Sequence, residues 1–91
     1  MKLFINVQQS ALDNEKVVDR STWKVDLNTE VTATKKVSDL LVELKTRVDA
    51  GSGYDVSNEL LISEGKTAKA SDKVQSLNLK ELVYQFSVTK K

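Results

Sequence analysis

The sequence predicts an α+β fold, in which four to five strands form a mixed sheet packed on one helix. Apolar and polar residues alternate over positions 3–7, 23–27 and 82–88, the period of half-buried strands. Over positions 37–48 the apolar residues recur at steps of three and four, the period of an amphipathic helix. Helices therefore do not alternate with strands along the chain, which excludes a doubly wound parallel sheet.

Two strands are expected before the helix, each with one apolar face. The apolar positions of the first are Leu3, Ile5 and Val7, and those of the second are Trp23, Val25 and Leu27. Residues 9–21 are mostly polar, so we expect them to form a long connection, although Val17 and Val18 could extend either strand.

The helix is predicted from the apolar stripe Val37, Leu40, Leu41, Leu44 and Val48. Thr32 and Thr34 are both plausible N-caps, because their hydroxyls can accept hydrogen bonds from first-turn amides. Gly51 can adopt the left-handed conformation that ends many helices.

The rest of the chain predicts two more strands. The run Leu60–Ile62, after Tyr54 and Val56, indicates a strand that is bounded by Gly65. Residues 63–73 are expected to be a polar loop, and the segment from Val74 to Leu79 a short helical turn or a packed loop. The apolar strand over 82–88 is expected in the sheet centre, beside the first strand. Elements in this order indicate a β-grasp.

Composition excludes several kinds of chemistry. The 91 residues, enough for a single domain, include no cysteine, histidine or proline. Disulfides, thiolate zinc sites and Ser–His–Asp catalysis are therefore excluded. A net charge of +1 gives no long-range attraction to nucleic acid or to anionic membranes. We expect no enzymatic activity, no cofactor, no metal, no nucleic-acid or membrane partner, and a cytoplasmic location.

Three local features each allow two interpretations. Glu64-Gly65-Lys66-Thr67 resembles the end of a phosphate-binding loop, but the glycine that the motif needs five positions earlier is replaced by Leu60, which favours a turn. Four lysines could form a basic strip for nucleic acid, but acidic residues lie among them and no aromatic residues do, which favours a solvated loop; they are Lys66, Lys69, Lys73 and Lys80. Trp23 could anchor an interface, but its phase favours the core.

The chain resembles ubiquitin and its superfamily. The opening Met1–Ile5, the segment Trp23–Leu27 and the segment Leu60–Lys66 are similar to ubiquitin's first strand, second strand and leucine-isoleucine-phenylalanine-alanine-glycine-lysine segment. The connections before and after the second strand are longer here. The chain ends Val88-Thr89-Lys90-Lys91 where conjugated members end in Gly-Gly, so the resemblance implies a ubiquitin-like domain and not a modifier.

The resemblance also suggests a partner-binding surface. Leu61 falls near the isoleucine at the centre of ubiquitin's recognition patch, and Val83 or Gln85 falls near its partner valine. If Leu60 and Ile62 point inward, alternation directs Leu61 outward, together with Phe4 and Val83. The alternative is that Leu61 is buried under the loop around Val17 and Val18.

These observations predict a non-catalytic interaction module formed by residues 1–91. We expect it to bind another protein through the exposed sheet face, at Leu61, Val83, Phe4 and Gln85, and to be monomeric in isolation. It would be the N-terminal recruitment or assembly domain of a longer scaffold or adaptor. The alternative is a free-standing ubiquitin-like accessory component of an enzyme or secretion machine.

Overall fold

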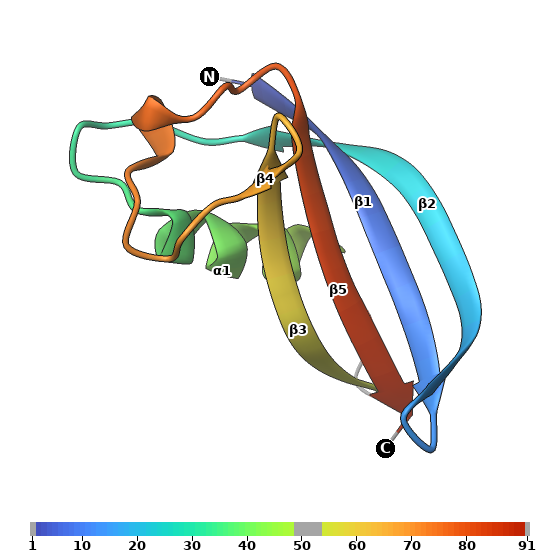
Figure 1. Ribbon diagram of the computed structural model, residues 1–91. Coiled ribbons are helices and arrows are strands. Elements are labelled where there is room, and N and C mark those ends of the chain that lie inside the picture. The colour runs from blue at the N-terminus through green and yellow to red at the C-terminus, as the bar shows by residue number, and fades with distance from the viewer. Residues whose placement is uncertain (1, 49–53, 91) are drawn as a thin grey trace.

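The computed structural model describes residues 2–48 and 54–90, and these residues form one α-helix packed on a five-stranded mixed sheet (Figure 1). The strand order is β2-β1-β5-β3-β4. The central strands β1 and β5 run parallel, and the other neighbours run antiparallel. The predicted α+β class is confirmed, and the arrangement is consistent with a β-grasp. The elements are β1 (Lys2–Asp13), β2 (Lys16–Asn28), α1 (Val37–Val48), β3 (Tyr54–Ser63), β4 (Lys66–Thr67), the 3-10 turn η1 (Val74–Ser76) and β5 (Leu82–Lys90).

The first two strands form a hairpin that is much longer than expected. Residues 9–21 are not a connection: they continue β1 and β2, and the turn consists only of Asn14 and Glu15. Both turn residues have positive φ angles, 50° and 65°, as a two-residue type I′ turn requires. In Figure 1 this hairpin extends well beyond α1. Of the two interpretations of Val17 and Val18, extension of a strand is confirmed, because both belong to β2.

The core lies between α1 and the face of the sheet that α1 covers. Leu3, Ile5 and Val7 of β1 are buried there, as predicted. The other buried apolar residues are Val25, Leu27, Val37, Leu40, Leu44, Leu61, Val74, Leu82, Tyr84, Phe86 and Val88. The rings of Tyr84 and Phe86 stack with centroids 4.9 Å apart. Trp23 packs against this cluster but is only partly buried.

The predicted N-caps of the helix are wrong. The α1 helix begins at Val37, so Lys36 is the capping residue, and Thr32 and Thr34 lie too far upstream, with their hydroxyl oxygens 3.4 Å apart. The Asp39 carboxylate accepts a hydrogen bond from the Lys36 amide at 3.2 Å. This is the reciprocal half of a capping box, formed without the threonine.

A distant loop satisfies the first helical amides. Val37 donates to the Asp72 carbonyl at 2.8 Å, and Ser38 donates to the Ala70 carbonyl at 3.1 Å. Local sequence cannot predict such partners, because they lie more than thirty residues away. The expected C-cap at Gly51 lies outside the described residues.

The segment after β3 is a second tight hairpin. Glu64 and Gly65 have φ angles of 51° and 77° and connect β3 to β4, whose Lys66 pairs with Ser63. Residues 63–73 are therefore not wholly a loop. The predicted short helical turn is confirmed as η1, and β5 lies beside β1 as predicted. Among residues 2–48 and 54–90, no helix has the length and apolarity needed to cross a membrane.

Candidate functional site

Three of the four predicted partner-binding residues lie on the face of the sheet that α1 leaves uncovered. Phe4 is 67% exposed there, and Val83 and Gln85 are partly exposed. Leu61 is 0% exposed and faces the helix, so its predicted outward orientation is wrong. The strand register explains this, because Leu61 lies opposite Tyr84, a core residue.

Because Leu61 points into the core, its neighbours Leu60 and Ile62 face outward and not inward as expected. Leu60 and Ile62 point away from the core and contribute to the uncovered face, with Leu60 39% exposed. The alternative, that Leu61 is buried, is confirmed, but the covering segment is not the one expected, because Val17 and Val18 lie in β2, separated from β3 by β1 and β5. Three consecutive apolar residues carry no phase information, so the sequence could not decide which residue was buried.

The strand register places three apolar residues of this face around Val83. Ile62 lies opposite Val83, and Val83 lies opposite Asn6 in β1. Leu60 lies opposite Gln85, which is two residues after Val83 in β5. Phe4 lies two residues before Asn6, on the same face of β1. We call Phe4, Leu60, Ile62 and Val83 the apolar patch. Sequence reasoning missed Leu60 and Ile62.

Polar residues continue the face beyond the patch. A shallow hollow of about 430 Å³ has Asn6, Gln8, Lys24 and Val83 in its lining. A neighbouring hollow of about 390 Å³ has Gln8 and Gln85 in its lining. An apolar centre with a polar surround is the usual anatomy of a protein–protein interface.

An exposed ion-pair cluster lies at the β2 margin of this face. The Asp26 carboxylate lies 3.5 Å from the Lys2 ammonium and 3.5 Å from the Arg47 guanidinium. The charge of Lys2 is the main cause that lowers the pKa of Asp26. The Nε of Arg47 also donates to the Asp26 backbone carbonyl at 3.2 Å, so this side chain joins α1 to the edge of β2.

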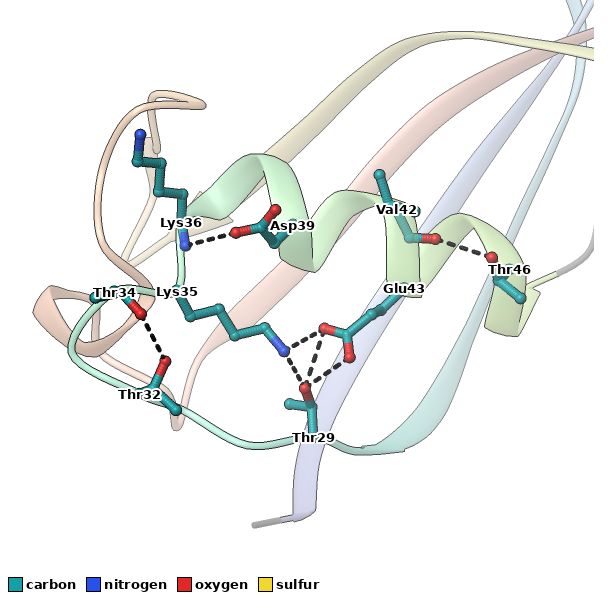
Figure 2. Close-up of polar contacts among 9 residues, drawn as sticks. All are labelled: Thr29, Thr32, Thr34, Lys35, Lys36, Asp39, Val42, Glu43 and Thr46. Carbon is teal, nitrogen blue, oxygen red and sulfur yellow. Dashed lines mark hydrogen bonds and ion pairs between the residues drawn. The ribbon is translucent and has the colours of Figure 1, made fainter.

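A partly buried polar cluster joins the β2–α1 connection to the helix (Figure 2). The Thr29 hydroxyl is 2.9 and 3.0 Å from the two oxygens of Glu43. The Lys35 ammonium contacts both the Thr29 hydroxyl and the Glu43 carboxylate, and its side chain is only 13% exposed. Each group is bound to the other two, so the cluster fastens the connection to α1.

A second partly buried contact fixes the irregular part of β3. The Tyr84 hydroxyl donates to the Glu59 carboxylate at 2.5 Å. Burial, and then this hydrogen bond, raise the pKa of Tyr84 well above its ordinary value. Glu59 follows Asn58, whose φ is 54°, where the pairing of β3 with β5 is interrupted. The contact therefore holds a bulge in place.

The remaining motifs take simple structural forms. Glu64-Gly65-Lys66-Thr67 forms the β3–β4 turn and the two residues of β4, as the favoured interpretation predicts. The four lysines of the possible basic strip, Lys66, Lys69, Lys73 and Lys80, are exposed. A nucleic-acid role for them stays an untested alternative.

The described part of the chain contains no group of three or more acidic side chains placed to hold a metal ion. The sequence matches no protein-family model, and a search of curated proteins finds no significant relative. The uncovered face of the sheet is the feature of this molecule that points to a function.

Proposed function

We propose that this chain is a non-catalytic protein-interaction module of the ubiquitin-like superfamily, which recruits or assembles a partner as part of a scaffold or adaptor. The apolar patch carries this proposal. Phe4 on β1 and Leu60 on β3 are large apolar side chains that are exposed to water. Exposed apolar patches rimmed by polar residues are typical of surfaces that bind other proteins.

The partner's chemistry follows from the patch and its surround. Val83 and Ile62 are only partly exposed, so they offer a shallow apolar floor, and Phe4 projects beside them. Amides from Asn6 and Gln85 flank this floor and can bond polar groups at the rim. We therefore expect a partner surface with a few aliphatic or aromatic anchors surrounded by uncharged polar groups. Cytoplasmic localisation belongs to the same proposal, and cell fractionation would test it.

Two substitutions on the patch test the proposal against one exposed control. Phe4→Asp and Val83→Asp place charges on the patch, whereas Val42→Asp changes a 66% exposed valine on α1. Proteins captured from the source cells by the wild-type chain would be purified and titrated against each variant by calorimetry. We expect the partner to bind wild type and Val42→Asp and to lose about 100-fold or more in affinity for the patch variants.

The outcome that contradicts the proposal is equally clear. If Phe4→Asp and Val83→Asp bind the partner as tightly as wild type, the patch is not the docking surface. If no cellular protein is retained by wild type more than by the two patch variants, the chain has no partner on this face. Circular dichroism of each variant verifies that the fold is intact before binding is compared.

A further inference from the structure

The outer edge of β2 presents unpaired backbone groups to solvent. β2 is an edge strand of the sheet, and its pairing with β1 is regular from Asp19 to Asn28. The opposite edge differs, because β4 covers Ile62 and Ser63 and a bulge at Asn58 interrupts the rest of β3. A long regular edge is a template for another strand unless something blocks it.

Two local contacts cap this edge on either side of Thr22–Lys24, a segment that we call the open window. The Asp19 carboxylate accepts the Arg20 amide at 2.8 Å, and Arg47 donates to the Asp26 carbonyl at 3.2 Å. Both groups therefore point away from β1. In an antiparallel pair the outward direction recurs at every second residue, so Thr22 and Lys24 also direct their N–H and C=O groups outward. Within the described residues, nothing bonds these groups.

The open window is symmetric about Trp23. Thr22 and Lys24 lie one residue to either side of it, and their unpaired groups complement those of the same segment running in the opposite direction. Trp23 itself is on the helix side of the sheet and only partly buried, although the core prediction would bury it fully. A half-buried tryptophan beside unpaired backbone groups is the residue type that dominates interface energies.

We propose that the chain forms a symmetric homodimer by antiparallel pairing of two β2 edges, with Trp23 on the two-fold axis. Thr22 of each copy lies opposite Lys24 of the other, and the two indole rings meet across the axis. The interface is isologous, as closed dimers require. The two sheets then form one continuous sheet with both helices on the same side.

The side-chain charges select this register. On the helix-free face, Arg20 of one copy lies opposite Asp26 of the other, and no like charges are directly opposed. Sliding the second strand by two residues in one direction opposes Arg20 to Lys24. Sliding it in the other direction opposes Lys24 to Lys24. Opposite charges in cross-strand pairs are favourable, and like charges are unfavourable.

Sedimentation velocity over about 10 µM to about 1 mM chain tests the proposal, because dimer formation follows mass action. We expect the average mass to rise toward twice that of the monomer, with a change in Trp23 fluorescence over the same range. Thr22→Pro removes an outward N–H that β1 does not use, a placement that edge strands tolerate. It should hold the chain monomeric, and Thr22→Val, which keeps the N–H, should dimerise like wild type.

Cysteine pairing supplies a second measurement that does not depend on the proline variant folding. Because the chain has no cysteine, an introduced thiol reports only its own position. An equimolar mixture of Thr22→Cys and Lys24→Cys chains should form mixed disulfide dimers at least about tenfold faster than either variant alone, since only the mixed pair is directly opposed. A monomeric mass up to about 1 mM, dimers unaffected by Thr22→Pro, or equal cross-linking rates would overturn the proposal.

Discussion

Comparing alanine substitutions at buried Leu61 and exposed Leu60 tests the β3 register directly. Leu61 is 0% exposed and packs in the core, whereas Leu60 is 39% exposed on the other face. Leu61→Ala removes buried methyl groups and leaves a cavity, which typically costs about 2–5 kcal/mol. Leu60→Ala removes the same atoms from a site in contact with water, so we expect a loss of less than about 1 kcal/mol.

Urea unfolding followed by circular dichroism measures the free energy of unfolding that each variant loses, and both variants carry the same leucine-to-alanine change. In a domain of this size, each kcal/mol also lowers the melting temperature by about 4–8 °C, so a thermal scan separates the variants clearly. The ratio is diagnostic, because a slip of one residue in β3 would exchange the two side chains between faces. If Leu60→Ala destabilises the chain more than Leu61→Ala, the register and the patch derived from it are wrong.

Three further predictions concern stability. The pKa of Tyr84 is raised in the folded chain, so Tyr84 stabilises the fold fully below about pH 10. Above that pH the phenol ionises in the unfolded chain first, and the stabilisation falls as pH rises. Urea midpoints at about pH 8 and about pH 11 should therefore differ less in Tyr84→Phe than in wild type. Lys35→Met should cost about 1–2 kcal/mol in urea unfolding by unpairing its buried contacts, and the exposed neighbour Lys36→Met should cost less than half of that. Glu15→Gly should raise the unfolding free energy by about 1 kcal/mol, because φ at this position is 65°; an unchanged midpoint would contradict that turn geometry.

How far the sequence predicts the fold depends on what lies against each strand. Leu3, Ile5 and Val7 alternate with more polar or exposed residues because α1 and the core cover their face, and this alternation predicts the strand. The same strand continues through Gln9 and Ser10, where both faces carry polar residues and the apolar alternation stops. Periodicity reports burial, not backbone pairing, so the far half of the hairpin resembled a loop.

The sequence predicts the orientation of a candidate residue correctly where the strand phase is clear and wrongly where it is not. Phe4 and Val83 were placed on the outer face because clear alternation in β1 and β5 fixed their phase. Leu61 was misplaced because its two neighbours are also apolar, and the bulge at Asn58 breaks the alternation before them. Only the pairing with Tyr84, a contact across twenty-three positions of sequence, resolves the choice.

The two proposed surfaces make one joint prediction. A two-fold axis perpendicular to the sheet keeps both helix-free faces on the same side, so a β2-edge dimer presents two apolar patches on one surface. A partner immobilised at high density could then bind both patches, and the second contact would be intramolecular. Thr22→Pro should therefore weaken apparent binding to the dense surface by about tenfold or more.

The same variant separates dimerisation from patch binding. Thr22 lies on β2 at the far side of the hollow that Val83 also lines, and outside the apolar patch, so affinity for a monovalent partner in solution should change far less in Thr22→Pro than in Phe4→Asp or Val83→Asp. Conversely, Phe4→Asp should abolish partner binding and leave the sedimenting mass unaltered. If Thr22→Pro weakens both formats equally, the edge contributes to the docking surface itself, and the two surfaces are not independent. If it weakens neither, the dimer gives no avidity.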